Sequence, residues 1–264
     1  MSKVRTGVSV VVPMFNENRV LPALIEELTR QFPSPKCEFF LVDDGSTDDT
    51  HGLATQLTKG DDRITTFSLP KNSGKGAALR AGVARTTGDT VLFMDADLST
   101  SLDDVDNFLR RLKSSEIVIG SRSVAGAVVS RSSRFRSLMG RSFNTLMRLS
   151  TGLNIRDSQC GFKAFHGDVA RLVFNLSENN HFTFDPEILR IGTALGYSIE
   201  EVPVTWAAGE HSSVRPVRDS IRCAFELIPL RFRTRQKRIQ DLAARSKLPV
   251  PTPLTQKNEH ESLG

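Results

Sequence analysis

The chain has 264 residues, of which 39% are apolar and 25% are charged, and its formal net charge is +5 with a pI near 9.3. No apolar run approaches the roughly 20 residues that a membrane-spanning helix needs. The three cysteines are widely spaced and lack Cys-x-x-Cys spacing, which argues against a disulfide framework or a zinc site. The composition predicts a soluble globular protein, and the positive charge favours anionic partners such as nucleotides, phospholipids or nucleic acid.

Strand and helix patterns alternate through the first 120 residues. Apolar and β-branched runs predict strands at residues 8–12, 38–42, 63–67, 90–94 and 116–119. Between them, apolar residues at helical spacing predict helices at residues 20–32, 51–57, 75–84 and 101–112. This alternation indicates an α/β fold with an open, mostly parallel, doubly wound sheet, whose ligands bind at the carboxyl ends of the strands.

Acidic and polar motifs follow several of these predicted strands. They are PMFNEN at 13–18, DDGSTD at 43–48, DAD at 95–97 and GSR at 120–122. Carboxylates crowded on one edge repel each other, so a cation, a bound base or ribose hydroxyls must share that edge. Residues 72–76 (NSGKG) fit either a phosphate loop or a helix that opens on small residues. No P-loop or Rossmann glycine motif follows the first strand, which argues against both folds.

Asp95 and Asp97 are the candidate metal ligands. They stand two residues apart at the expected end of a buried strand, with the small Ala96 between them, so both can turn toward one ion. Mg²⁺ and Mn²⁺ prefer oxygen ligands and are commonly held by one or two carboxylates together with substrate phosphates. The alternative is that Asp97 opens an Asx turn or caps a helix that begins near Ser101.

Several longer motifs occur in a fixed order along the chain: PMFNEN (13–18), VDDGSTDDT (42–50), NSGKGAALRAG (72–82), DADLS (95–99), IGSR (119–122), DSQCGFKAF (157–165), FTFDPEIL (182–189) and VPVTW (202–206). This ordered set resembles the inverting GT-A glycosyltransferases of family 2. Within that family, the chain is most similar to the dolichyl-phosphate glucosyl- and mannosyltransferase-like branch, over roughly its first 215 residues.

The resemblance implies a nucleoside site at the first two motifs. Pro13, Glu17 and Asp44 would border the nucleoside, with Asp44 near the base. The alternative for Glu17 is helix capping, and capping is an equally good account of Asp48.

The resemblance also implies a site for the sugar diphosphate. Asp95 and Asp97 would hold the ribose and a Mg²⁺ or Mn²⁺ ion on the diphosphate. Ser99 stands where mannosyl-type relatives have Gln, which weakens the case for a side-chain metal ligand there. Arg122 would face the phosphates, because its fixed fork of donors suits oxyanions.

Two arginine-bearing segments are candidate acceptor sites. Residues 131–149 have apolar side chains at helical spacing with arginines among them, which fits a helix in a membrane interface or a core-facing helix with solvated arginines. Arg134 and Arg136 would face an acceptor phosphate. By resemblance, residues 210–215 form a mobile loop whose Ser213 and Arg215 close on the sugar diphosphate.

The domain organisation follows from composition and resemblance together. Residues 1–215 are predicted to form the catalytic domain, 216–247 a basic amphipathic helical extension, and 248–264 a disordered tail. The extension can bind an anionic membrane surface or be a solvated helix face, whereas no reader motif supports nucleic acid. Without an apolar signal core the protein is expected in the cytoplasm, with peripheral attachment to the inner face of the membrane left open.

Two acceptor chemistries remain open. If the nucleophile is a hydroxyl, a general base must take its proton, and Asp185 is the best-placed candidate, with Glu187 second. If it is a polyprenyl phosphate, no base is needed, because the second pKa of a phosphate monoester is near 6. The arginine-rich second half fits the phosphate better.

The predicted function is therefore transfer of a hexose, with inversion, from a nucleotide diphosphate sugar of the UDP-glucose or GDP-mannose type to a polyprenyl phosphate. The catalytic group would comprise Asp97, Arg122 and, for a hydroxyl acceptor, Asp185. The alternatives are a soluble GT-A enzyme that acts on a hydroxyl of a sugar, lipid or secondary metabolite, and a catalytically silent nucleotide-sugar-binding protein.

Overall fold

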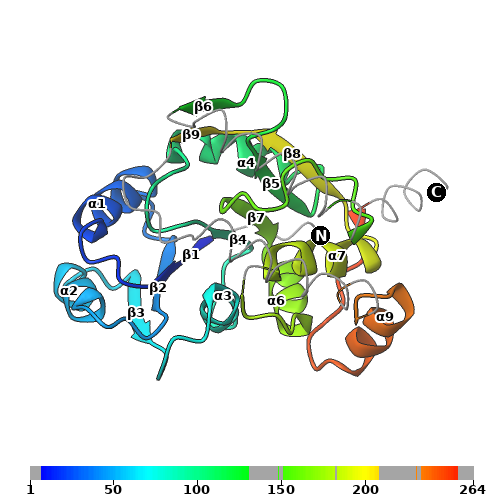
Figure 1. The fold of residues 1–264 in the computed structure, drawn as a ribbon, viewed down its shortest axis with the longest axis horizontal. Coiled ribbons are helices and arrows are strands. Elements are labelled where there is room, and N and C mark those ends of the chain that lie inside the picture. Colours follow the sequence, from blue (N-terminus) through cyan, green and yellow to red (C-terminus); the bar gives the residue numbers. More distant parts are fainter. Residues whose placement is uncertain are drawn as a thin grey trace.

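The computed structural model describes residues 7–130, 148, 151–181, 183–207, 230 and 233–254. Within these residues, a central sheet has seven strands in the order β3-β2-β1-β4-β7-β5-β8 (Figure 1). These strands are β1 (Val8–Met14), β2 (Glu38–Asp43), β3 (Ile64–Ser68), β4 (Thr90–Phe93), β5 (Ile117–Ser121), β7 (Lys163–His166) and β8 (Ile199–Pro203). Only β7 runs antiparallel to its neighbours. A two-stranded sheet pairs β6 (Val128–Ser130) with β9 (Thr205–Ala207).

Helices cover both faces of the central sheet (Figure 1). One layer contains α1 (Leu21–Gln31), α2 (Thr50–Leu57), the 3₁₀ helix η1 (Leu102–Asp104) and α4 (Val105–Arg111). The other layer contains α3 (Lys75–Val83), α6 (Gly167–Leu176), α7 (Phe184–Ala194) and α9 (Gln236–Arg245). Because side chains alternate along a strand, Val10 and Val12 are buried in the first layer and Val11 in the second. The predicted doubly wound, mostly parallel α/β sheet is confirmed.

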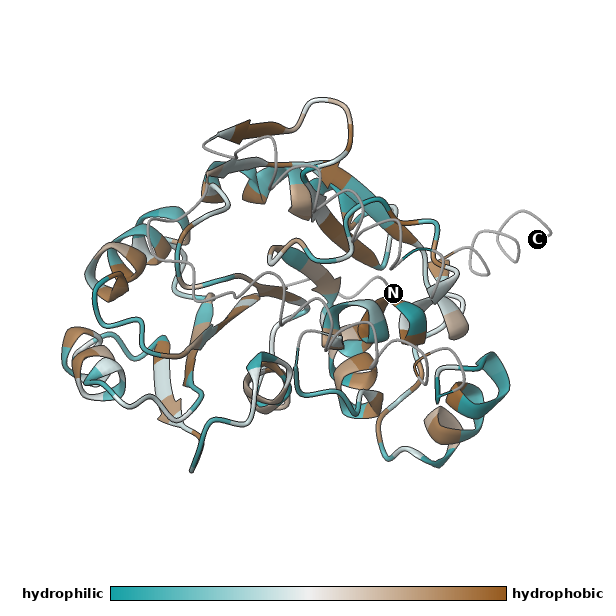
Figure 2. Ribbon diagram, in the orientation of Figure 1, coloured by the Kyte–Doolittle hydropathy of each residue, from teal (hydrophilic) through white to brown (hydrophobic). Residues whose placement is uncertain are grey.

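An aromatic cluster in the second layer fixes the helices that carry functional side chains. Phe93 of β4, Phe165 of β7, Phe174 of α6 and Phe184 of α7 are all buried, and the Phe93 centroid lies 6.0–6.1 Å from the other three. Burial of each such ring contributes about 1.5–3 kcal/mol. Helix α9 carries more hydrophilic than hydrophobic residues (Figure 2). The cluster holds the first turn of α7 close to the end of β4.

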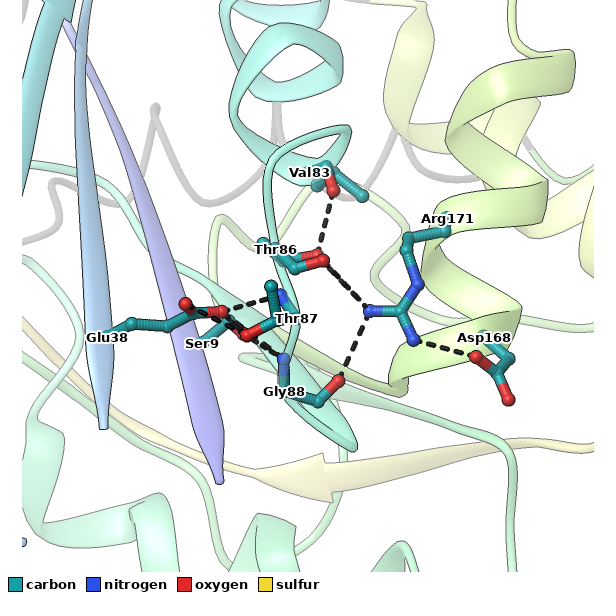
Figure 3. A network of polar contacts seen from close by, with 8 residues as sticks. All are labelled: Ser9, Glu38, Val83, Thr86, Thr87, Gly88, Asp168 and Arg171. Carbon is teal, nitrogen blue, oxygen red and sulfur yellow. Dashed lines mark hydrogen bonds and ion pairs between the residues drawn. The ribbon is translucent and has the colours of Figure 1, made fainter. Parts of the chain in front are cut away.

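A polar network joins the amino ends of β1 and β2 to α3 and α6 (Figure 3). This amino-edge network consists of Ser9, Glu38, Val83, Thr86, Thr87, Gly88, Asp168 and Arg171. Glu38 accepts hydrogen bonds from Ser9 Oγ (2.5 Å) and from the Thr87 backbone N–H (2.6 Å). Arg171 of α6 donates to backbone carbonyl oxygens after α3 and pairs with Asp168 at 2.7 Å. The network ties the turn between α3 and β4 to the sheet and to α6.

The C-terminal part of the described chain packs on the second layer. α9 buries Ile239 and Ala243 against this layer, beside α6 and α7. Beyond α9, Tyr197 donates its hydroxyl to the carbonyl oxygen of Pro251 (3.0 Å), and the Leu254 N–H donates to Glu116. The first residues of the tail that was predicted to be disordered therefore lie against the sheet. No helix in the described ranges is long and apolar enough to cross a bilayer.

Candidate active site

The carboxyl ends of β1, β2 and β4 meet the first turns of α3 and α7. We call this region the carboxyl edge and define it by Pro13, Glu17, Asp44, Lys75, Asp95, Asp97 and Asp185. The loops after β1 and β2 are locked together, because Asn16 Oδ1 accepts the Thr47 N–H (2.9 Å) and Ser46 Oγ accepts the Asn16 N–H (2.9 Å). The structure thus brings together the acidic motifs that the sequence placed at one edge.

Asp95 lies between a lysine and a glycine. Its Oδ1 accepts a hydrogen bond from Lys75 Nζ, at the start of α3, and this nitrogen also lies 5.8 Å from the ring centroid of Phe184. Burial opposes the charge on Lys75, but Asp95 and Asp185 outweigh it and raise the pKa of Lys75. A Cβ at Gly161 would collide with the Asp95 carboxylate, so any side chain there would displace Asp95 from this position.

Asp97 is the carboxylate available to a cation. Its Oδ1 accepts the Ser99 N–H at 2.9 Å, as in an Asx turn, and it makes no ion pair within the described residues. Carboxylate oxygens of Asp97 and Asp95 are the ligands that Mg²⁺ and Mn²⁺ prefer. No group of three or more His, Cys, Asp or Glu side chains in the described ranges forms a complete metal site. The side chains therefore fit a metal whose remaining ligands come from substrate phosphates and water.

Glu17 has a raised pKa, in part because other carboxylates lie near it at this edge. Its side chain is half-buried, and its backbone N–H donates to Thr50 Oγ1 at 2.8 Å. Burial, followed by repulsion from Asp97, Asp95 and Asp48, raises the pKa of Glu17 to about 7. A carboxyl group with such a pKa indicates a site that favours a cation. Asp48, in contrast, precedes the N-cap residue Asp49 and accepts the Thr50 N–H at 3.0 Å and the Thr50 hydroxyl, as in an Asx turn before α2.

Asp44 anchors the loop before α3. Its two carboxylate oxygens accept the backbone N–H groups of Ser73 and Gly74, each at 2.8 Å. Gly74 has φ of +100°, which favours glycine, and a Cβ there would collide with the carbonyl oxygen of Asn180. Burial raises the pKa of Asp44 despite these two donors. Asp44 therefore fixes the loop from which α3 begins, and with it the position of Lys75 at the carboxyl edge.

Arg122 lies beside the carboxyl edge, at the end of β5, and is held by Asp157. Its Nε and Nη2 donate to the two oxygens of this fully buried carboxylate at 2.7 and 2.8 Å. Burial opposes the charge on Arg122, but the hydrogen bonds and charge of Asp157 raise its pKa. The guanidinium carbon lies 5.5 Å from the Trp206 ring. Arg122 is therefore a fixed, permanent cation, and Nε and Nη2 are the guanidinium atoms that Asp157 holds.

Asp185 forms a buried ion pair with Lys163 of β7. Lys163 is fully buried, and its Nζ donates to Asp185 Oδ1 and, at 2.5 Å, to the carbonyl oxygen of Cys160. Burial raises the pKa of Asp185, whereas Lys163 and Lys75 oppose this shift. Cations and carboxylates thus alternate across the site: Lys163 on β7, Asp185 on α7, Lys75 on α3 and Asp95 after β4.

The sequence prediction missed three partners in this arrangement: Lys75, Asp157 and Lys163. Each of the three lies inside one of the motifs named above. Lys163 is also the one charged residue in the apolar strand KAFH, and a lysine in such a strand indicates a buried acidic partner. The predicted residues Ser213, Arg215, Arg134 and Arg136 lie outside the described residues. Pro13 lies near the carboxyl end of β1, opposite Val42 of β2.

The chain can now be compared with known proteins. A protein-family model described as glycosyl transferase family 2 matches residues 9–174. A dolichyl-phosphate beta-glucosyltransferase of Trichomonas vaginalis is 34% identical over 84% of this chain and 72% of its own length. The human dolichyl-phosphate beta-glucosyltransferase is 31% identical over 85% of this chain and 75% of its own.

A solved structure has a similar fold. Glucosyl-3-phosphoglycerate synthase from Mycobacterium tuberculosis, in complex with Mn²⁺, uridine diphosphate and phosphoglyceric acid, matches with a TM-score of 0.65. The match covers 86% of this chain and 78% of that chain, with 22% sequence identity. The fold and the acidic edge define a GT-A glycosyltransferase. The chain belongs to glycosyl transferase family 2, as its sequence motifs predicted.

Proposed function

We propose that this protein transfers glucose from UDP-glucose to a dolichyl-type polyprenyl phosphate, with inversion at the sugar's anomeric carbon. The observation that carries the proposal is the similarity to dolichyl-phosphate beta-glucosyltransferases over more than four fifths of the chain. It favours the UDP-glucose type of donor over the GDP-mannose type. The acidic carboxyl edge supports a nucleotide sugar as the donor, because its carboxylates suit ribose hydroxyls and a cation.

The donor would lie along the carboxyl edge. Pro13, Glu17 and Asp44 would border the nucleoside, and Asp95 and Asp97 would hold the ribose and a Mg²⁺ or Mn²⁺ ion. When bound, such an ion neutralises charge on the diphosphate. The Lys75 ammonium pairs with Asp95 and orients its carboxylate, whereas Asp97 makes no ion pair in the described residues and would be the freer ligand for the ion.

The leaving diphosphate needs fixed positive charge. An oxygen of the acceptor phosphate attacks the anomeric carbon, the bond from that carbon to the diphosphate breaks, and UDP carries the electron pair away. Asp157 holds Arg122 in one orientation, so this cation need not reorganise as charge develops on the departing oxygen. Outside the described residues, Ser213 and Arg215 would close on the same diphosphate.

The acceptor is proposed to be a phosphate and not a hydroxyl. Asp185 is the candidate base for a hydroxyl, but it is buried and its carboxylate already pairs with Lys163. A phosphate monoester is largely ionised near neutral pH and needs no base. Arg134 and Arg136 would then bind the acceptor phosphate. Asp185 serves in this proposal to position Lys163 and Lys75, and not to move a proton.

The central experiment incubates the protein and Mn²⁺ with labelled UDP-glucose, GDP-mannose or UDP-galactose, each with a polyprenyl phosphate. We expect label from UDP-glucose alone to partition into organic solvent. Transfer to a soluble sugar hydroxyl instead, with no lipid-linked product, would contradict the proposal.

Asp185→Asn tests the acceptor chemistry separately. A phosphate nucleophile loses no proton, so kcat of the folded variant should fall by less than about tenfold, whereas loss of a general base costs about 10²–10⁴-fold. The variant's Tm must be measured first, because Lys163 loses its partner. A fall of 10³-fold in a folded variant would favour the hydroxyl acceptor.

The domain division predicted from the sequence also stays a proposal: a catalytic part at 1–215, a basic extension at 216–247 and a tail from 248. The extension is proposed to bind an anionic membrane surface through Arg231, Arg233 and Arg235, of which the last two are described and exposed. Replacing all three with Gln should weaken binding to anionic vesicles, by about 1 kcal/mol per residue at low salt. Equal binding of both proteins at low salt would contradict peripheral attachment.

A further inference from the structure

A pocket of about 470 Å³ lies between α3, α6 and the segment that follows α9. Its lining includes Arg80 of α3, Arg171, Phe174 and Asn175 of α6, and Lys247 and Leu248 beyond α9. None of the residues that define the carboxyl edge lines it. Asn175, Lys247 and Leu248 also lie beyond residue 174, where the family match ends. The pocket is therefore separate from the site proposed for the nucleotide sugar.

Arg80 is the cation in this pocket with the least compensation. Its Nη1 donates to the carbonyl oxygen and hydroxyl of Ser177 (2.8 and 2.9 Å), and its Nη2 donates to Asn180 Oδ1. All these acceptors are neutral, and no carboxylate within the described residues forms an ion pair with Arg80. Burial lowers the pKa of Arg80, with Glu187 opposing this shift, so the guanidinium lies where its charge is disfavoured. An anion in the pocket would stabilise it.

Two more cations point to the same ligand chemistry. Arg171 donates to carbonyl oxygens and to Asp168, and its Nε has no acceptor within the described residues (Figure 3). Lys247 is exposed and forms no ion pair with another described residue. No carboxylate is among the residues that line the pocket. Outside the lining, Asp168, whose side chain is 63% exposed, pairs with Arg171, and Glu187 acts on Arg80 without forming an ion pair. The pocket keeps a net positive charge.

The shape of the pocket indicates the size of that ligand. Phe174 and Leu248 provide an apolar wall beside the three cations. The volume is within the 300–1,000 Å³ that is typical of small-molecule sites and exceeds what a bare phosphate ion fills. Guanidinium groups bind phosphate oxygens with two donors at once. The geometry points to a second anion site, at Arg80, Arg171 and Lys247, for a phosphate monoester that carries an organic group.

Two sources could supply such a group: a soluble phosphate ester or the headgroup of a phosphatidic-acid-type lipid. The test uses sn-glycerol 3-phosphate for the first and phosphatidylcholine vesicles with phosphatidic acid for the second. Pocket variants are Lys247→Gln and Asn175→Asp, which alter exposed side chains and leave Arg80 and Arg171 in place. Matched controls are Lys113→Gln and Asn107→Asp on the opposite helix layer. All variants should keep the wild-type Tm.

Calorimetry with sn-glycerol 3-phosphate should show affinity about tenfold weaker in each pocket variant than in its control, since each loses or repels one charge-assisted contact. If the soluble ester does not bind but phosphatidic acid vesicles bind less well to the pocket variants, the ligand is a lipid headgroup. Phosphatidylglycerol vesicles control for general charge. Equal binding of pocket variants and controls to both probes, or no binding of either probe, would overturn the inference. Its failure would leave the proposed glucosyl transfer untouched.

Discussion

At the amino edge of the central sheet, Glu38 accepts hydrogen bonds from Ser9 and from two backbone N–H groups, and Arg171 pairs with Asp168 (Figure 3). At the carboxyl edge, Asp97 accepts one backbone N–H, and the pKa of Glu17 is raised first by burial and then by the neighbouring carboxylates. The same sheet therefore has one edge whose carboxylates are satisfied by donors within the chain and one whose carboxylates repel one another.

This difference has a physical cause. Carboxylates that serve the fold gain stability from fixed donors, whereas carboxylates that bind a cation must keep oxygens free and accept mutual repulsion. The carboxyl edge limits that cost with two ion pairs, Lys75–Asp95 and Lys163–Asp185. The same conservative replacement of a carboxylate by an amide should thus have opposite effects at the two edges.

The largest effect is expected at Asp97. Asp97→Asn keeps the side chain's size but removes one negative charge from the proposed cation site, so turnover should fall by about 10³-fold. The free energy of unfolding should change by less than about 0.5 kcal/mol, because Asp97 makes no ion pair in the described residues. Steady-state kinetics at saturating Mn²⁺ and a urea titration measure the two quantities.

The matched control for this variant is Asp106→Asn, which alters an exposed carboxylate on α4. It should change neither turnover nor stability. Near-normal turnover of Asp97→Asn at saturating metal would remove Asp97 from the proposed site and weaken the contrast between the edges.

The second effect concerns the ion pair that stabilises the carboxyl edge. Lys163→Met leaves the Asp185 carboxylate buried without its partner, which should lower the free energy of unfolding by about 3–5 kcal/mol. Lys163→Met combined with Asp185→Leu should lose less than the single variant, because no uncompensated charge stays buried. Urea unfolding of both variants, with Lys113→Met as the exposed control, checks this. A double variant less stable than Lys163→Met would show that the unpaired Asp185 carboxylate is not the source of the loss.

The third effect concerns Glu38, the carboxylate of the amino edge. Glu38→Gln replaces one carboxylate oxygen by an amide group, so one donor among Ser9 and the turn after α3 loses its acceptor. The expected loss is about 1–3 kcal/mol of unfolding free energy, with kcat and KM unchanged. Glu26→Gln, at an exposed position of α1, serves as the control. A tenfold loss of kcat in a folded Glu38→Gln variant would mean that the amino edge is not purely structural.

The elements that the sequence placed accurately are those with continuous buried patterns. The run from Val8 became β1 and the run from Glu38 became β2, because these strands are buried on both faces and every residue carries the signal. The helix expected at 101–112 begins instead as η1, since Ser101 Oγ accepts the Asp103 N–H and caps a tighter turn. The antiparallel β7 was not predicted, because its four residues are too short to show a period.

The candidate site also has a part that the sequence predicted and a part that it did not. The acidic motifs could be placed at one edge because the carboxyl ends of parallel strands meet there. Their cationic partners could not, because pairing depends on contacts distant in sequence: Arg122 and Asp157 are 35 residues apart, and Lys163 and Asp185 are 22 apart. Asp185 illustrates the consequence, since its motif position suggests a base and its burial against Lys163 suggests a positioning role.

The smallest expected effect is a pH dependence at Glu17, whose pKa is raised from 4.5 to about 7, first by burial and then by Asp97, Asp95 and Asp48. The folded protein therefore keeps a proton that the unfolded chain releases between these two pH values. Unfolded molecules bind fewer protons in this window, so the wild type loses stability as pH rises from about 4.5 to about 7. Glu17→Gln cannot titrate, so its stability relative to the wild type should increase across the window and stay constant above it.

Urea unfolding of both proteins at several pH values measures this difference, with Glu26→Gln as the control that should follow the wild type. Saturating Mn²⁺ and UDP should shrink the difference, because a cation beside Asp97 offsets the repulsion that keeps Glu17 protonated. If Glu17→Gln and wild-type stability run parallel from pH 4.5 to 8, the carboxyl edge does not carry the uncompensated charge described above, and the contrast with the amino edge would have to rest on Asp97 alone.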